Sequence, residues 1–239
     1  MISVCIATHN GEKYIKAELL SILCQLGQND EIIISDDGSS DNTIAEIMSV
    51  NDDRIRIVRK QYCQLKKSVH YYITHNFGNA ITQAKGDIIF LADQDDVWYP
   101  NKVQECLQAL ANNIAVLHNL ECVDRELNSL GYMWYNEENE FRRHNWFMRK
   151  GKHMGCALVF KRELLEYVLP FPDQLVIHDF WLGMIAEIKG GLYYLDKPLI
   201  KYRIHGGNAS GTSQKKNSLI YRVYYRLYTM FHVLLRIIY

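Results

Sequence analysis

The sequence predicts an α/β fold with a mostly parallel sheet flanked by helices, and three observations lead to this prediction. Short apolar runs alternate with segments of helical periodicity through the first half of the chain. These apolar runs are nearly continuous, as expected of strands that are buried on both faces of a sheet. Polar clusters follow the ends of three runs. Because ligands of such sheets bind beyond the carboxyl ends of the strands, the clusters predict one site at one edge.

The composition is that of one well-packed domain. A chain of 239 residues, 48% of them hydrophobic, can bury a sizeable core, which excludes a disordered protein. The formal net charge is zero, so we expect no nucleic-acid partner. No linker rich in Pro, Gly or Ser interrupts the chain, so we expect one domain over residues 1–212 and a tail over 213–239.

Cysteine usage and the first residues favour a cytoplasmic protein. The six cysteines are scattered without a CxxC pair, which predicts free buried thiols in a reducing compartment rather than a zinc site. The N-terminal segment lacks the basic and long apolar regions of a signal peptide. No uncharged apolar run approaches the ~20 residues that a membrane-spanning helix needs. The cysteines are Cys5, Cys24, Cys63, Cys106, Cys122 and Cys156.

The alternation of elements can be followed in order through the first half. The predicted strands are residues 2–7, 31–35, 55–58 and 87–92. Apolar residues recur at helical spacing between and after these strands. The predicted helices carry residues 15–26, 44–48, 73–84 and 103–110. Ser40 or Asp41 can cap the second helix, and Pro100 suits the start of the fourth.

The second half is less regular. Its apolar runs predict further strands over residues 115–118, 155–160 and 192–195. Helical patterns cover residues 163–168 and 179–189. Residues 125–150 are polar and aromatic, and their pattern predicts no element.

The tail over residues 218–239 predicts an amphipathic helix with a basic face. On a helical wheel Arg222, Arg226, Thr229 and Arg236 fall on one stripe, and apolar residues lie elsewhere. A basic, aromatic-rich helix suits the surface of an anionic membrane, whereas arginines disfavour a spanning helix. We expect peripheral attachment at the inner face of the cell membrane. The alternative is a helix that packs on the main domain or on a dimer partner.

The strongest single motif is the acidic cluster Asp93, Asp95 and Asp96, directly after a predicted strand. Three carboxylates in four residues repel one another, so the cluster needs a cation or hydrogen-bond donors to offset the repulsion. Hard oxygen ligands suit Mg²⁺ or Mn²⁺, and either ion commonly bridges to phosphate oxygens. The alternative is a solvated acidic turn that caps the next helix.

A second cluster, Asp36-Asp37-Gly38-Ser39, follows the strand over residues 31–35 in the same way. A carboxylate at this place can accept a hydrogen bond from a nucleotide base or from a ribose hydroxyl. Taken alone, the cluster is as well explained by a turn with a helix cap.

These motifs, in this order and spacing, resemble the family 2 glycosyltransferases over roughly residues 2–211. Residues 91–96 look like that family's metal motif, called DxD, and residues 36–41 look like its second motif. The other matching segments are residues 3–10 with Tyr14, 84–89, 155–157, 160–163, 178–181 and 202–205 with Asn208 and Gly211. The last of them resembles the closing motif of the rhamnosyltransferase-like branch. The segment over 75–80 departs from the family, which often has a longer stretch with an arginine there.

The resemblance implies a GT-A-type, Rossmann-like fold and roles for particular residues. Asp179 is expected to be the general base, and Asp36 to be structural or a weaker contributor to nucleotide binding. Nucleotide-sugar contacts are expected from Thr8, Asn10, Glu12, Asp37, Asp93 and Asp95. Metal ligands are expected among Asp95, Asp96 and His205. Asp93 is a further candidate ligand, and an ordinary loop histidine is the alternative for His205. Acceptor contacts are expected from Gly155, Cys156, His178 and Trp181. Trp134 and Trp146 are further candidates for stacking on sugar rings, with packing in the core as the alternative.

The resemblance also implies an inverting transferase that uses a UDP- or dTDP-sugar, with Mn²⁺ or Mg²⁺. A departing nucleoside diphosphate builds up negative charge that a divalent cation stabilises. The acceptor hydroxyl must lose a proton as it attacks, and a carboxylate can take it. We expect the acceptor to be a glycan or a lipid-linked glycan in the synthesis of a surface polysaccharide such as O-antigen or capsule.

Two other functions are compatible with parts of the pattern. A sugar-phosphate nucleotidyltransferase usually opens with a Gly-rich loop and a basic residue for the triphosphate, which residues 8–12 lack. A non-catalytic nucleotide-sugar-binding or scaffold protein would not need the acidic residues at 95, 96 and 179, and their presence favours an enzyme.

Overall fold

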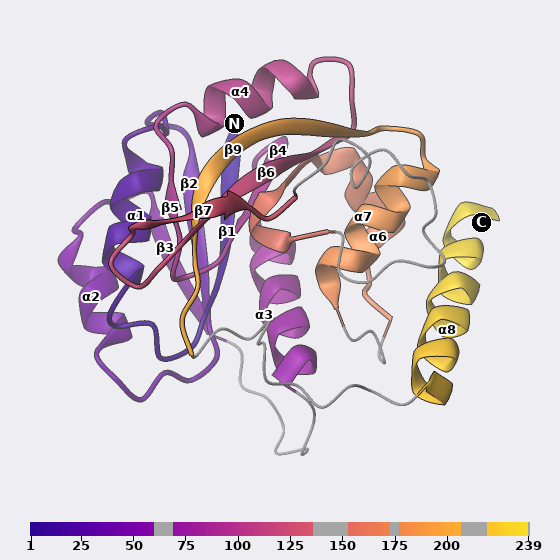
Figure 1. The fold of residues 1–239 in the computed structure, drawn as a ribbon, viewed down its shortest axis with the longest axis horizontal. Coiled ribbons are helices and arrows are strands. Elements are labelled where there is room, and N and C mark those ends of the chain that lie inside the picture. The colour runs from indigo at the N-terminus through magenta and orange to yellow at the C-terminus, as the bar shows by residue number, and fades with distance from the viewer. Residues whose placement is uncertain (60–68, 136–152, 173–176, 207–218, 239) are drawn as a thin grey trace.

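A central curved sheet with flanking helices forms the body of the protein in the computed structural model (Figure 1). The structure describes residues 1–59, 69–135, 153–172, 177–206 and 219–238. The predicted class, an α/β fold with a C-terminal helix, is confirmed. The proposed boundary near residue 212 lies outside the described residues and stays a prediction.

Strands and helices alternate in the first half as the sequence predicts. The strands are β1 (Ile2–Thr8), β2 (Glu31–Asp36), β3 (Ile55–Arg59), β4 (Ile88–Ala92) and the short β5 (Val97–Trp98). The helices are α1 (Ile15–Leu23), α2 (Thr43–Ser49), α3 (Val69–Gln83) and α4 (Lys102–Leu110). Every residue of β2 is buried, as are most residues of β1 and β4. The continuous apolar runs therefore arise because both faces of these strands are covered.

The second half is built from longer strands and shorter helices. Its strands are β6 (Ala115–Val123), β7 (Ser129–Met133), β8 (Leu158–Lys161) and β9 (Leu192–Arg203). The 3₁₀ turns are η1 (Gly155–Ala157) and η2 (Arg162–Leu164), and the helices are α6 (Leu165–Val168), α7 (His178–Ile188) and α8 (Leu219–Ile238). The predicted strand over 155–160 is thus wrong in its first half. The carbonyl of Cys156 accepts a hydrogen bond from Lys102 Nζ at 2.9 Å, which replaces a sheet partner.

The sheet order is β3-β2-β1-β4-β8-β6-β9-β5, and β7 pairs with β6. Strands β1 to β4 run parallel, whereas β8 runs antiparallel to both of its neighbours. Because β9 is parallel to β6, its end lies at the same edge as the ends of β1, β2 and β4. The C-terminal ends of β1, β2, β4 and β9, from distant parts of the chain, thus lie together at one edge of the sheet.

Helix α8 packs on the domain through Thr229 and Arg236. The Thr229 side chain is 1% exposed, and Arg236 donates hydrogen bonds to the carbonyls of Leu169 and Pro170 at 3.0 and 2.7 Å. The helix contacts α6 and α7 and stands at the side of the molecule (Figure 1). Within the described part of the chain, no helix combines the length and the apolarity needed to cross a membrane.

The free thiols agree with the prediction except at one position. Cys5, Cys106, Cys122 and Cys156 are buried and free, whereas Cys24 is exposed because it follows the last turn of α1. Cys63 lies outside the described residues.

Candidate active site

The loops after β1, β2 and β4 lie together at one edge of the sheet. Thr8 pairs with Asp36 across β1 and β2, and the N–H of Asp37 donates to the Thr8 carbonyl at 3.0 Å. The loop after β4 reaches the same segment through Gln94, described next. The structure therefore brings the two acidic clusters to the two sides of the loop after β1, as their placement after the strands predicts.

Gln94 joins the acidic loop to the loop after β1. Its Oε1 accepts hydrogen bonds from Thr8 Oγ1 at 2.6 Å and from the His9 N–H at 2.9 Å, and its Nε2 donates to the His9 carbonyl at 3.2 Å. A Cβ at Gly11 would lie 2.5 Å from Gln94 Oε1, which explains a glycine at this position. Sequence reasoning missed Gln94, although its place between three acids was a signal.

Asn10 and Glu12 hold the second acidic loop from the other side. Asn10 Oδ1 accepts the N–H of Ser40 at 2.8 Å, and Glu12 Oε2 accepts the N–H of Asn42 at 3.0 Å. These bonds fix the loop that carries Asp37. Asp36 accepts the N–H groups of the turn that follows it, which agrees with the expected structural role. The contacts of these residues with a nucleotide stay a prediction.

The Asp37 carboxyl group has a raised pKa. The first cause is burial, and Asp36 adds to it, whereas His9 lowers the pKa. His9 Nδ1 lies 2.9 Å from the Asp37 carbonyl oxygen, so this ring also ties the loops after β1 and β2 together.

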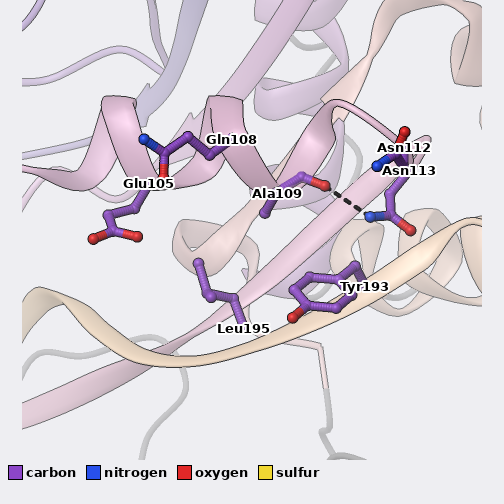
Figure 2. Close-up of a pocket in the computed structure, with 7 residues that line it drawn as sticks. All are labelled: Glu105, Gln108, Ala109, Asn112, Asn113, Tyr193 and Leu195. Atoms are coloured by element: carbon purple, nitrogen blue, oxygen red, sulfur yellow. Dashed lines mark hydrogen bonds between the residues drawn. The ribbon is translucent and has the colours of Figure 1, made fainter.

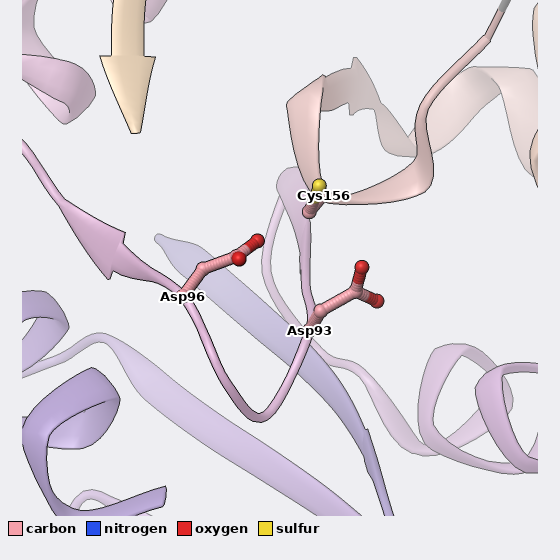
Figure 3. A group of neighbouring side chains, drawn as sticks. All are labelled: Asp93, Asp96 and Cys156. Carbon is pink, nitrogen blue, oxygen red and sulfur yellow. The ribbon is translucent and has the colours of Figure 1, made fainter. Parts of the chain in front are cut away.

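The acidic loop after β4 holds two carboxylates beside a thiol. Asp93, Asp96 and Cys156 each offer one ligand atom, and these atoms lie within 4.8 Å of one another (Figure 3). Burial, followed by repulsion from Asp95, raises the pKa of Asp93 to about 7 and that of Asp96 well above its usual range. Without a cation, these groups resist ionisation.

Asp95, on the acidic loop after β4, lies beside His205, which follows β9. His205 Nε2 lies 2.7 Å from Asp95 Oδ2, and both side chains are largely buried. The His205 ring also packs on Tyr14, with 5.2 Å between centroids. The structure thus brings together two of the three predicted metal ligands, and Asp96 is on the same loop. Their binding of an ion stays a prediction.

Arg203, at the end of β9, holds this loop in place. Its N–H donates to Asp96 Oδ1 at 3.0 Å, and its Nε donates to the Asp95 carbonyl at 2.7 Å. Its guanidinium lies 4.5 Å from the centroid of the Tyr14 ring. The motif that contains Arg203 and His205 therefore contacts the acidic loop with both residues.

A second buried cation, Lys102, lies behind the acidic loop. The side chain begins in the first turn of α4 and is 1% exposed. Its Nζ lies 3.9 Å from the Trp98 ring centroid and interacts electrostatically with Glu18 and Asp96. Sequence reasoning missed Lys102, because a lysine in the first turn of an amphipathic helix normally points to solvent.

Asp179 lies at the start of α7, close enough to Asp93 for the two charges to interact. Burial raises the pKa of Asp179 to about 7, and the Asp93 charge adds to the increase. The N–H of Phe180 donates to Asp179 Oδ1 at 2.6 Å, which limits the increase. A carboxylate that titrates near neutral pH is well suited to accept a proton.

His178 and Trp181 flank Asp179, and both are buried. Burial lowers the pKa of His178 to about 3, so its ring is neutral and stacks on Phe77 at 4.2 Å. A Cβ at Gly155 would lie 2.9 Å from His178 Nε2, so Gly155 and His178 pack directly on each other. Trp181 is 0% exposed and donates to the Val168 carbonyl at 3.0 Å. Its ring is therefore packed in the core of this structure, and the expected contact of Trp181 with an acceptor sugar stays a prediction.

Of the other aromatic candidates, Trp134 packs edge-on against Tyr202 with 5.3 Å between centroids, and it is partly buried. Trp146 lies outside the described residues, as do Asn208 and Gly211.

A pocket lies between α4 and the start of β9, away from the acidic loop (Figure 2). It is lined by Glu105, Gln108, Ala109, Asn112, Asn113, Tyr193 and Leu195. The first residues of the 12-residue strand β9 line the pocket, whereas Arg203 at its C-terminal end contacts Asp96. The pocket therefore lies at the end of the strands opposite to the acidic loop. It holds none of the predicted site residues.

Acidic loops at the carboxyl edge of a GT-A-like sheet, with a carboxylate at Asp179, define a glycosyltransferase architecture. The model of glycosyl transferase family 2 matches residues 3–169. The chain belongs to this family, and it is a glycosyltransferase. The resemblance inferred from the motifs is therefore confirmed.

Two glycosyltransferases of stated substrate are similar to this protein over most of the chain. The UDP-Glc:alpha-D-GlcNAc-diphosphoundecaprenol beta-1,3-glucosyltransferase WfgD of Escherichia coli is 29% identical over 90% of this chain and 82% of its own length. The dTDP-rhamnosyl transferase RfbG of Shigella flexneri is 26% identical over 87% of this chain and 74% of its own length.

Solved structures share the fold. Residues 1–349 of S. aureus TarS, in complex with UDP-GlcNAc, superpose with a TM-score of 0.67 and 18% identity over 90% of this chain. This chain spans 61% of the length of that structure. At this identity the likeness concerns the fold alone.

Proposed function

We propose that the chain moves a sugar from a UDP- or dTDP-sugar to a hydroxyl group of a glycan or lipid-linked glycan, with inversion at the anomeric carbon. The observation that carries the proposal is Asp179, a carboxylate with a pKa of about 7 beside the acidic loop. Inversion needs a base on the acceptor side and no covalent enzyme nucleophile. The three buried cysteines Cys5, Cys106 and Cys156 have raised thiol pKa values, which disfavours a thiolate nucleophile.

In this mechanism the residues bind, orient and move one proton. Thr8 and Asp37 hold the nucleotide at the ends of β1 and β2, with Asp37 at the base. Asn10 and Glu12 hold these two loops together, and Gln94 ties the loop after β1 to the acidic loop after β4. Asp179 accepts the proton of the attacking hydroxyl, and the backbone N–H groups of Phe180 and Gly155 hold the carboxylate in place.

The donor set of the acidic loop fits a divalent cation. Asp95 Oδ2 and His205 Nε2 are adjacent, and the buried Asp96 Oδ2 has no hydrogen-bond partner among the described residues. Carboxylate oxygens with one imidazole suit Mn²⁺ and Mg²⁺. Such an ion, held by Asp95, Asp96 and His205, would stabilise the negative charge on the departing diphosphate.

The substrates are proposed from the relatives. A dTDP-rhamnosyl transferase and a UDP-glucosyltransferase that acts on a diphosphoundecaprenol-linked sugar are both similar to this chain. These two relatives support a nucleoside-diphosphate sugar as donor and a lipid-linked glycan as acceptor, in polysaccharide synthesis. The branch resemblance at residues 202–205 favours rhamnosyl transfer.

A donor screen tests this function. The purified protein is incubated with UDP- and dTDP-sugars and Mn²⁺ or Mg²⁺, and the release of nucleoside diphosphate is measured. We expect release from at least one donor, loss of the release in EDTA, and recovery with excess Mn²⁺. Release that persists in EDTA contradicts the metal assignment, and absence of binding to every nucleoside diphosphate contradicts the function.

Helix α8 supports a site of action at an anionic membrane, at the inner face of the cell membrane. The helix turns Thr229 and Val233 to the domain and leaves a row of large apolar side chains in solvent. These exposed residues are Val223, Tyr224, Leu227, Phe231, Leu234 and Leu235. An apolar row of this kind, with arginines in the same helix, suits the boundary between lipid headgroups and acyl chains.

Cosedimentation with vesicles that contain anionic lipid tests this attachment. Phe231 and Leu234 are 58% and 48% exposed, and we expect Phe231→Ser or Leu234→Ser to lower the vesicle affinity by about tenfold. The matched control is Leu130→Ser on β7, where the leucine is 43% exposed but distant from α8 in the sequence, and it should change nothing. A protein that ignores vesicles and forms dimers that Phe231→Ser dissociates would assign the row to a second copy instead.

A further inference from the structure

A buried histidine away from the acidic loop joins the segment before η1 to helix α7. The His153 side chain is 3% exposed, and its Nε2 lies 3.1 Å from Glu187 Oε1, near the C-terminal end of α7. The Tyr194 hydroxyl on β9 donates a hydrogen bond to the same oxygen. Since an ionised carboxylate only accepts hydrogen bonds, Nε2 carries the proton that His153 donates. The mechanism proposed above uses none of these three residues.

The middle of α7 leaves room for this ring. A Cβ at Gly183 would lie 2.3 Å from Cγ and Cδ2 of His153, so a larger residue at this position would collide with the imidazole. Glycine weakens the interior of a helix relative to alanine, so its presence here favours close packing over helix propensity. Phe180, earlier in α7, has its ring centroid 6.1 Å from that of His153. The fit over Gly183 therefore ties His153 to α7 independently of the bond to Glu187.

Two residues after His153, the same segment reaches the proposed base. The Gly155 N–H donates a hydrogen bond to the Asp179 carboxylate, and a Cβ at Gly155 would lie 3.6 Å from Asp179 Cβ. Met154, between His153 and Gly155, has an extended backbone. Two residues span at most about 7 Å, so the position of His153 limits where the Gly155 N–H can lie. One short segment thus contacts α7 near both of its ends.

We propose that His153 is a positioning residue that places the Gly155 N–H at the Asp179 carboxylate. Glu187 and Gly183 hold His153 on α7, and His153 acts through Gly155 rather than on a substrate. The inference rests on the proposed role of Asp179 as the base, and it adds a residue that lies outside the motifs of the family resemblance.

Other groups also act on the Asp179 carboxylate. The Asp93 charge on the loop after β4 raises its pKa, and the N–H of Phe180 in α7 lowers it. The buried Tyr135 hydroxyl also interacts electrostatically with Asp179. These groups lie outside residues 153–157. A hydrogen bond to an ionised carboxylate favours the ionised form, so the Gly155 N–H lowers the pKa of Asp179 against the effect of burial.

Titration of the Asp179 carboxyl carbon by NMR tests the proposal in protein with labelled aspartate. The signal is assigned by its absence in Asp179→Asn. In His153→Ala the midpoint should rise by about one pH unit, from about 7 to about 8, because the carboxylate loses the Gly155 hydrogen bond. His153→Gln, whose amide N–H can donate to Glu187, should restore the lower midpoint. The control His232→Ala removes an imidazole from α8 and should leave the midpoint unchanged.

Two further variants separate positioning from packing. Gly183→Ala alone puts a methyl group where the ring lies, and it should raise the Asp179 midpoint as His153→Ala does. When Gly183→Ala is combined with His153→Ala, the methyl group fills part of the vacated space, so the melting temperature should exceed that of His153→Ala. The midpoint should nevertheless stay high, because the bond to Glu187 is still missing. With an active donor, kcat/KM below pH 7 should fall by about tenfold in His153→Ala, while the KM of the donor stays unchanged.

The outcomes distinguish this proposal from the proposed function. A midpoint that stays near 7 in His153→Ala, or in Gly183→Ala where the first variant does not fold, would overturn the proposal even if the donor screen shows an active transferase. So would a double variant that regains the low midpoint together with its stability. A midpoint that rises as expected in a protein that transfers no sugar would support the position of His153 and contradict the proposed function.

Discussion

Replacement of Asp179 by Asn is expected to reduce sugar transfer by about 10²- to 10⁴-fold, because the acceptor hydroxyl loses its general base. The amide has nearly the same shape, and it can still accept the N–H of Phe180. We expect the affinity for the nucleoside diphosphate to stay unchanged, because the residues proposed to hold that molecule lie on other loops. Initial rates with a saturating donor, together with nucleotide binding by calorimetry, check both statements.

The pH dependence of the same step follows from the pKa of Asp179. Burial raises this pKa to about 7, so the carboxyl group is protonated and inactive as a base below that pH. Values of kcat/KM for the acceptor should therefore rise with pH up to about 7 and then level off. Asp179→Asn should remove this rise. A rate that still increases through pH 7 in the variant would assign the base to another residue.

The matched control for Asp179 is Glu166→Gln. Glu166 is an exposed acid on α6, the helix that packs against α7. Like Asp179→Asn, Glu166→Gln removes one negative charge close to α7, but it lies outside the candidate site. Transfer should therefore stay within a factor of about two, as usual for surface substitutions. Transfer that falls equally in both variants would point to a general effect of charge.

The sequence predicted the strands of the first half well because they are buried on both faces. A short apolar run such as residues 31–35, placed between helical segments, is best explained as a strand buried on both faces. The sequence also placed Thr8, Asp37 and Asp95 at one edge, because residues that follow parallel strands meet there. Asp95 and His205 are 110 positions apart, and only the family resemblance brought them together before the structure did.

Other features could not be predicted, because they depend on tertiary contacts. A helical wheel of residues 218–239 identifies a polar stripe, but it does not predict that Thr229 and Arg236 face the domain. The hydrogen bonds from Arg236 to the carbonyls of Leu169 and Pro170 fix that orientation. Likewise, Trp181 follows the proposed base closely in sequence, yet its position in the helix turns the indole ring into the core. Direction along a helix determines which of two neighbouring residues reaches a site.

Lys102→Met is expected to lower the free energy of unfolding by about 3 kcal/mol at pH 8, although the two side chains have similar volumes. Lys102 is buried, and its charge acts on Glu18 and Asp96. Without that charge, these carboxyl groups stay buried with less compensation. The Cys156 carbonyl also loses the hydrogen bond from Nζ. Urea unfolding followed by circular dichroism measures the difference.

The size of this loss should depend on pH, and the direction follows from the acids. Burial raises the pKa of Glu18 to about 8 and that of Asp93 to about 7, above the values of unfolded chains. Groups with raised pKa values bind protons more tightly in the folded state, so stability falls as pH rises through these values. Lys102 opposes this fall by favouring the ionised acids. The gap between wild type and Lys102→Met should therefore widen from pH 6 to pH 8.

The control for Lys102 is Lys197→Met, which also removes one positive charge beside α4. Lys197 Nζ lies 2.8 Å from Glu105 Oε2, but its side chain is 53% exposed. An exposed ion pair contributes less than about 1 kcal/mol, so this variant should unfold nearly as the wild type does at both pH values. If the two variants lose the same stability, or if the loss at Lys102 is equal at pH 6 and pH 8, then the buried cation does not support the acidic loop. The loop would then depend on Arg203 and its hydrogen bonds to Asp95 and Asp96.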